Sequence, residues 1–169
     1  REIGYMFGQY KRLKNEFTGV LTGKGVSWGG SLIRPEATGY GTVYFAEDML
    51  NYEGNSLKGK TVTISGAGNV AQYAAEKCLH LGAKVLTMSD SNGFIFDKDG
   101  INEDKLKHIM FLKNVKRSRI SEYLKKYPNA SYVKDKKPGS IQCDVALPCA
   151  TQNELDHLDA KNLISNGCY

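Results

Sequence analysis

The chain of 169 residues is poor in cysteine, proline and histidine, with 4 Cys, 4 Pro and 3 His. The cysteines show neither CxxC spacing nor a histidine at metal-ligand spacing, so we expect reduced thiols and no metal site. No apolar run approaches the roughly 20 residues that cross a bilayer, and the N-terminus lacks the regions of a signal peptide. These absences argue against a disulfide scaffold and a membrane protein, and they favour a cytoplasmic setting.

The composition is that of a globular domain, with 41% hydrophobic and 24% charged residues. The chain begins at Arg1 without an initiator Met and stops at Tyr169, directly after Gly167 closes a predicted helix. We therefore expect an internal fragment of a longer protein. A complete sheet then requires chain that lies outside this sequence.

The N-terminal third is predicted to be helical and loop-like. Residues 5–13 have the spacing of an amphipathic helix, whereas the glycine-rich stretch 17–34 has no helical periodicity. Pro35 stands at a plausible first helical position of the next helix, because its fixed φ suits the first turn.

The pattern changes after Leu57. A strand at 60–65, a helix at 69–81 and a strand at 84–88 form a unit of about 30 residues, typical of the right-handed βαβ crossover of a parallel sheet. Beyond it we expect, in order, a short extended segment at 93–96, a turn at 97–100, helices at 102–113 and 118–127, a strand at 144–147 and a helix at 155–165.

The strongest local motif is ISGAGNVA at 64–71, where Gly66, Gly68 and Ala71 fill the small positions of GxGxxG/A. Gly66 permits a tight turn, Gly68 lets the backbone approach a diphosphate, and the following helix offers its N-terminal N–H groups to an anion. The motif predicts an α/β fold class with a Rossmann-like dinucleotide-binding domain. The alternative is a glycine turn that binds nothing.

Asp90 follows the second strand directly and is flanked by Ser89 and Ser91. Dinucleotide-binding domains hold the adenosine ribose with an acidic residue about 20 positions after the glycine motif. The alternative is that SDSNG is only a turn that Asp90 caps. By itself Asp90 favours NAD, because a carboxylate repels a 2′-phosphate.

Basic residues are concentrated between Lys105 and Lys126, where Glu122 is the one acidic residue. A solvated helix face is one reading, and a cradle for a 2′-phosphate is the other, since Lys and Arg bind phosphate well. A nucleic-acid-binding module is a further alternative, motivated by the same region and a pI near 8.9. Scattered aromatic residues and the lack of a nucleic-acid motif count against it.

The sequence resembles the hexameric NADP-specific glutamate dehydrogenases, within the Glu/Leu/Phe/Val dehydrogenase family, along its whole length. The resemblance is clearest in REIGYMFGQYKRL (1–13), LTGKGVSWGGSLIRPEATGYG (21–41), ISGAGNVAQ (64–72), SDSNG (89–93) and ALPCATQNELD (146–156). It implies that Thr38 contacts the nicotinamide end of the cofactor, that Ala150 and Thr151 line the nicotinamide ribose, and that Asn69, with Val70 beside it, contacts phosphate or ribose groups. The positions that resemble the 2′-phosphate site are Lys113, Lys116 and Arg119.

The resemblance also implies what lies elsewhere. The family's catalytic lysine and aspartate precede Arg1, so we expect no catalytic residue in this chain and no activity from it alone. The residues 1–55 would end the substrate domain and 56–169 would begin the truncated NADP-binding domain. The intact enzyme, a homohexamer, would convert 2-oxoglutarate, ammonium and NADPH to L-glutamate; an NAD-dependent amino-acid dehydrogenase is the alternative. We read His80, His108 and His157 as surface or core residues.

Overall fold

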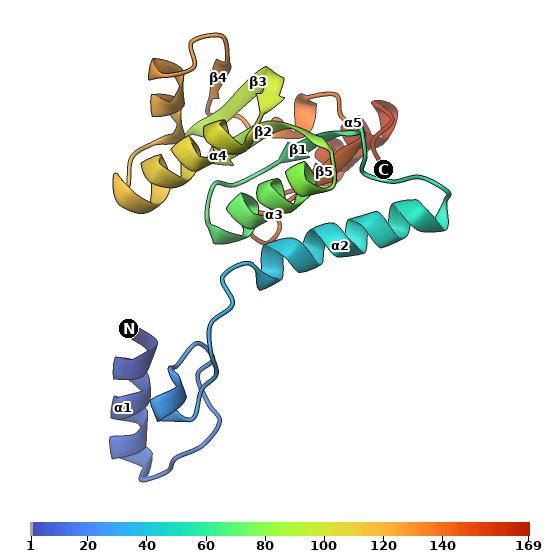
Figure 1. The fold of residues 1–169 in the computed structure, drawn as a ribbon. Helices are drawn as coiled ribbons and strands as arrows, with labels where there is room; N and C mark the ends of the chain where they lie inside the picture. Colours follow the sequence, from blue (N-terminus) through green and yellow to red (C-terminus); the bar gives the residue numbers. More distant parts are fainter. Residues whose placement is uncertain (1) are drawn as a thin grey trace. The chain divides into compact units, whose positions relative to one another are not determined.

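The computed structural model describes residues 2–169, which divide into two compact units, one ending at Pro35 and the other beginning at Glu36 (Figure 1). In the first unit, helix α1 (Glu2–Lys14) packs against a loop that carries one short 3₁₀ turn, η1 (Val26–Trp28). Phe7 is fully buried there, with its ring 5.3 Å from that of Phe17 and 6.2 Å from that of Trp28. The predicted helix at 5–13 and the loop after it are confirmed.

The second unit opens with helix α2 (Ala37–Tyr52). Its first intrahelical bond runs from the Tyr40 N–H to the Glu36 carbonyl, at 2.9 Å. Pro35 was predicted as the first helical position, but Pro35 and Glu36 form a turn and the helix starts two residues later. The fixed φ of proline suits a turn as well as the first position of a helix, so the sequence alone does not distinguish the two.

A five-stranded sheet, in the order β4-β3-β2-β1-β5, forms the centre of this unit. The central strand β1 (Thr61–Ile64) runs parallel to β2 (Lys84–Asp90) and to β5 (Val145–Leu147). Strand β3 (Gly93–Ile101) is antiparallel to β2 and to the edge strand β4 (Ser131–Lys134). The predicted α/β class and its parallel βαβ unit are confirmed, and the sheet as a whole is mixed.

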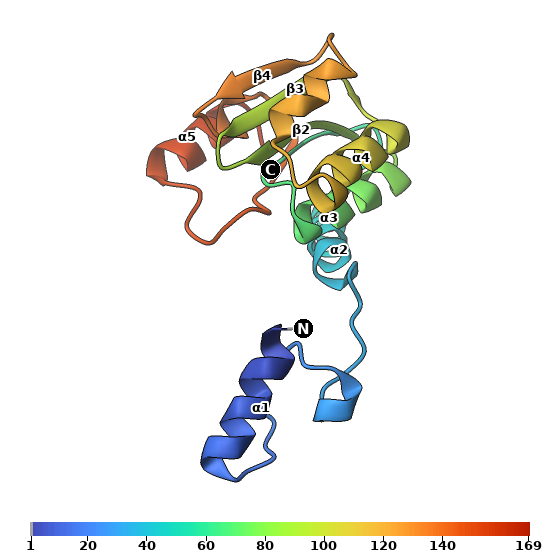
Figure 2. The same ribbon diagram turned by 90° about the vertical axis from the view of Figure 1, so that its left-hand side faces the viewer.

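Helices cover both faces of the sheet, as the two ribbon views show (Figures 1 and 2). On one face lie α3 (Asn69–His80) and α4 (Glu103–Met110), which begins at Asn102 as its N-cap. On the other lie η4 (Pro138–Ser140) and α5 (His157–Ser165), which a capping box of Asp156 and Asp159 starts. Buried apolar side chains between sheet and helices, including Val62, Ile64, Val85, Met88 and Ile95, form the core.

The turn predicted at 97–100 is instead a bulge within β3. Val85 pairs with Ile101 and Thr87 with Phe96, so a step of two residues on β2 corresponds to five on β3. The Asp97 carboxylate accepts the Asp99 N–H at 3.1 Å, and Gly100 has a φ of +90°. The turn chemistry of DKDG is therefore real, but pairing on both sides of it keeps the strand continuous.

Two further elements differ from the sequence prediction. Strand β4 was not predicted, because its four residues, none of them buried, are too short a pattern, and the strand forms through pairing with β3. The helix expected at 118–127 is a 3₁₀ helix, η3 (Ile120–Lys125), preceded by Arg117 at a φ of +52°. The helix predicted at 102–113 is confirmed, with a π-helical turn, η2 (Phe111–Val115), extending α4. Within residues 2–169 no helix has the length and apolarity that a bilayer crossing requires.

Candidate functional site

A groove of about 700 Å³ opens at the carboxyl ends of β1, β2 and β5. The chain leaves β1 for β2 on one side and later reaches β5 on the other, so the groove lies at the point where the strand order reverses. Open α/β sheets bind ligands at such a switch point, in sites of roughly 300–1,000 Å³. Nine of the twelve predicted site residues line it: Gly66, Gly68, Asn69, Val70, Ser89, Asp90, Lys113, Ala150 and Thr151.

The glycine turn forms the floor of the groove. Gly66 has a φ of +82°, and a Cβ built there would lie 2.9 Å from the Cys149 carbonyl oxygen, so only glycine fits. Its N–H donates to the Ser89 hydroxyl at 2.6 Å, which ties the turn to the end of β2. Gly68 is the N-cap of α3, and no atom lies within 4 Å of a Cβ built there. The backbone at Gly68 is therefore open to a ligand.

Asp90 is held by three donors at the end of β2. Its Oδ2 lies 2.8 Å from the Ile120 N–H and 3.4 Å from Lys113 Nζ, and its Oδ1 accepts the Asn92 N–H at 3.0 Å. Partial burial alone would raise the pKa of Asp90, but these hydrogen bonds and the Lys113 charge hold it below its usual value. The carboxylate is thus ionised and compensated by its own neighbours. The structure shows Asp90 in the turn that the sequence offered as one alternative, and it also places Asp90 in the lining of the groove.

The remaining three predicted residues do not line the groove. Arg119 donates from Nη1 to the hydroxyl of Ser91, a groove residue, at 2.7 Å. Lys116 is exposed, and its ammonium lies 5.6 Å from the centre of the Phe111 ring. Thr38 is exposed in the first turn of α2, next to Gly39, which packs against the beginning of α3.

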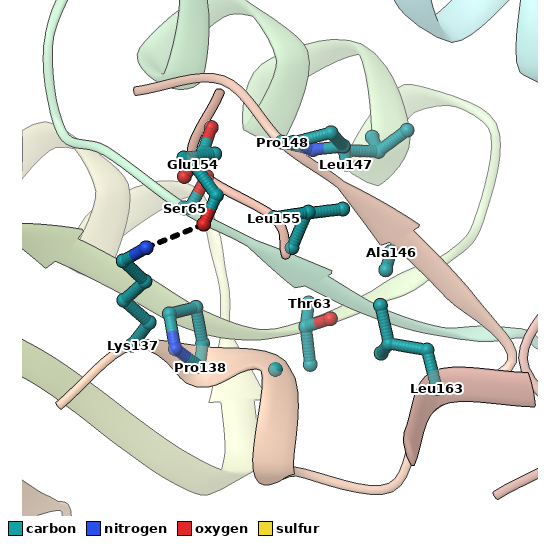
Figure 3. Close-up of a pocket in the computed structure, with 11 residues that line it drawn as sticks. Thr63, Ser65, Lys137, Pro138, Ala146, Leu147, Pro148, Glu154, Leu155 and Leu163 are labelled. Carbon is teal, nitrogen blue, oxygen red and sulfur yellow. Dashed lines mark hydrogen bonds between the residues drawn. The ribbon is translucent and has the colours of Figure 1, made fainter. Parts of the chain in front are cut away.

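The loop after β5 forms the wall opposite the glycine turn. The Cys149 N–H donates to Ser65 Oγ and the Ala150 N–H to Glu154 Oε1, each at 3.0 Å. Glu154 is only 8% exposed, and Lys137 donates to its carbonyl oxygen, as Figure 3 shows. Burial raises the pKa of Cys149 to about 12, which favours the protonated thiol at neutral pH. Ala150 and Thr151 thus line the groove from a loop that hydrogen bonds to Ser65 and Glu154 hold in place.

Sequence reasoning missed a second group of lining residues. Asp135, Lys136 and Lys137, from the turn after β4, line the groove together with Glu154. The run KDKK at 134–137 carries a visible charge signal, but without β4 nothing placed it near the glycine motif. In the described part of the chain no three His, Cys, Asp or Glu side chains are grouped as metal ligands, and His80 and His157 are exposed. All four cysteines are free thiols.

Comparison with known proteins places this groove in a family. The family model for Glutamate/Leucine/Phenylalanine/Valine dehydrogenase matches residues 29–169. The chain is 62% identical to the NAD(P)-specific glutamate dehydrogenase of Xylanibacter ruminicola over 169 residues, and 61% identical to the NADP-specific enzyme of Giardia intestinalis over 170. These alignments cover 100% and 99% of this chain, which spans 38% of the length of each relative.

A solved structure supports the same assignment. Glutamate dehydrogenase of Plasmodium falciparum is 48% identical, with a TM-score of 0.85 over 99% of this chain and 36% of that one. The coenzyme named for the relatives varies, because the enzyme of Bacteroides fragilis, 52% identical over 98% of this chain and 37% of its own length, is described as NAD-specific. Sequence, fold and groove agree: the chain belongs to the Glutamate/Leucine/Phenylalanine/Valine dehydrogenase family.

Proposed function

We propose that the protein containing this chain is an NADP-dependent glutamate dehydrogenase. It would convert 2-oxoglutarate, ammonium, NADPH and a proton reversibly to L-glutamate, NADP and water. The names of its relatives support a dehydrogenase of glutamate, and the activity is proposed for the whole protein because the chain spans 38% of their length.

The open space at Gly68 carries this proposal. Gly66 lacks room for a side chain because the backbone of the next loop fills it, whereas the space at Gly68 faces the groove and is empty. A turn that served only to pack a strand against a helix would be filled on this side. At the beginning of α3, the positive end of the helix dipole favours a diphosphate.

The residues of this chain would bind and orient the cofactor, which supplies the hydride when bound. The beginning of α3 would hold the diphosphate, and Ala150 and Thr151, in the loop that Glu154 and Ser65 fasten, would line the nicotinamide ribose. Thr38 would contact the nicotinamide end. The groups that polarise the substrate and move protons would come from chain outside this sequence.

NADP is preferred over NAD because of the environment of Asp90. A free carboxylate would bind ribose hydroxyls and repel a 2′-phosphate, but here Lys113 and two backbone N–H groups already occupy it. Arg119 beside Ser91 adds a positive charge. NAD is the competing proposal, because the enzyme of Bacteroides fragilis, a relative of this chain, is described as NAD-specific.

The wider organisation belongs to the same proposal. Residues 1–55 would end a substrate domain and 56–169 would begin the cofactor-binding domain, and the intact protein would be a homohexamer. The cytoplasmic location and the inactivity of this chain alone stay predictions from the sequence and its resemblance.

NADPH fluorescence on the full-length protein tests the central point. Gly68→Val should abolish measurable NADPH binding, because its side chain would occupy the diphosphate path. Gly41→Val is the matched control, since Gly41 also has nothing within 4 Å of a built Cβ but does not line the groove. Unchanged affinity in Gly68→Val would reject the assignment of the groove.

A further inference from the structure

A second basic segment faces the groove besides the one between Lys105 and Lys126. The turn 134–137, with the sequence KDKK, contributes Asp135, Lys136 and Lys137 to the same cavity as Asp90 and Ser91. It reaches the cavity from the edge strand β4, on the far side of β3 from β2. Two separate basic segments thus border one end of the groove.

The backbone holds this turn in place. Gly93 has a φ of +144°, and a Cβ built there would lie 2.2 Å from the Val133 carbonyl oxygen, so β4 can approach only a glycine. The carbonyl oxygen of Asn92 accepts the Asp135 N–H at 2.9 Å and the Tyr132 hydroxyl at 2.7 Å. These bonds fasten the KDKK turn to the turn that follows Asp90. These contacts therefore fix the backbone of the turn at Asp135, directly before Lys136.

The positive charges at this end differ in how far they are compensated. Lys113 is bonded to the Asp90 carboxylate, and Lys137 to the Glu154 carbonyl oxygen. The carboxylate of Asp135 lies 3.9 Å from Lys134 Nζ. Over residues 2–169, Lys136 has no hydrogen-bond or ion-pair partner, and Arg119 is bonded to a neutral hydroxyl rather than to a carboxylate.

We propose that Lys136 binds the phosphate on the adenosine ribose of NADP, together with Arg119, which the family resemblance already implies for that phosphate. The inference rests on the proposed function and names the residues that would discriminate NADP from NAD. A phosphate monoester carries about 1.5 to 2 negative charges and is bound best by charges that no other group neutralises. Lys113 instead neutralises Asp90, which removes the repulsion that this carboxylate would exert.

Binding titrations on the full-length protein without substrate test the inference. NADPH and NADH fluorescence would be measured for the wild type, Lys136→Ala and Arg119→Ala, with adenosine 2′,5′-bisphosphate as a competitor. Each variant should lose about tenfold in NADPH affinity, or about 1.4 kcal/mol, and keep NADH affinity within about twofold. Lys136→Arg should restore NADPH binding, because it keeps the charge.

Lys134→Ala is the matched control, since Lys134 belongs to the same KDKK run, at the end of β4, but does not line the groove. It should leave both affinities within about twofold of the wild type. Equal losses for NADPH and NADH in Lys136→Ala, or no loss, would overturn the inference while leaving the proposed dehydrogenase standing. A wild type that binds neither nucleotide would overturn the proposed function itself.

Discussion

The side-chain amides of Gln72 and Asn114 exchange two hydrogen bonds, of 3.0 and 2.9 Å. Gln72 is 2% exposed, and its Nε2 also donates to the Ala67 carbonyl oxygen at 2.8 Å. One buried amide thus joins the glycine turn to the π-helical turn that carries Lys113. The spacing between the glycine turn and Lys113 therefore depends on this pair.

Replacing Gln72 tests that link. Gln72→Leu should destabilise the folded protein by about 1–3 kcal/mol, because it removes the side-chain donor to the carbonyl oxygen of buried Ala67 and the paired bonds to Asn114. Urea unfolding of the full-length protein measures the loss. The double variant Gln72→Leu/Asn114→Leu should lose less than the sum of the two single variants. Additive losses would mean that the two amides do not interact.

Asp97 anchors the bulge in β3 and should be sensitive to substitution. It is 2% exposed, and its carboxylate lies 2.8 Å from Lys105 Nζ and 2.7 Å from the Tyr123 hydroxyl. Asp97→Ala should cost about 3–5 kcal/mol, because a largely buried lysine loses its counter-charge. Asp99→Ala is the control, since Asp99 is exposed and its backbone N–H remains. Thermal unfolding of both variants checks this, and similar losses would argue against the buried pair.

Two glycines of α2 should respond in opposite directions to alanine. A Cβ on Gly39 would lie 2.6 Å from the Val70 carbonyl oxygen and 2.7 Å from the Ala74 nitrogen, so α2 would have to move away from α3. Gly39→Ala should therefore destabilise by about 1–3 kcal/mol. Gly41→Ala meets nothing and should stabilise by about 0.5–1 kcal/mol. Urea unfolding of both variants decides, and a stabilising Gly39→Ala would contradict the close packing.

Asp90 should give the protein an acid-sensitive contribution to stability. Its pKa is lower in the folded chain than its ordinary value, so the folded state favours the ionised carboxylate. That contribution is fully present above the unfolded pKa of about 3.9 and is lost as the pH falls through the lower folded pKa. The difference in unfolding free energy between the wild type and Asp90→Asn should be constant near neutral pH and shrink in acid. A difference that does not shrink would contradict the pKa assignment.

Local chemistry in the sequence was enough to predict the centre of the fold. The β-branched run at 60–65, the glycine motif and the helical spacing of 69–81 identified the βαβ unit, because these patterns are set by neighbours along the chain. Asp90 was identified from its spacing to that motif and Ser89 as its neighbour, whereas Lys113 came from the basic region and the family resemblance. Of the predicted residues, nine line one groove in the structure.

What the sequence alone determined is the class of fold, the glycine turn and the charge of its surroundings, since each depends on residues close together in the chain. Only the tertiary structure decided which charges remain uncompensated. Strand β4 forms because it pairs with β3, and its own sequence does not predict it. The close contact of Gly93 with Val133 brings the KDKK run to the groove, and the positions of these residues along the chain do not reveal that contact. The pairing of Lys113 with Asp90, 23 positions apart, likewise exists only because the strand and the π-helical turn meet in space.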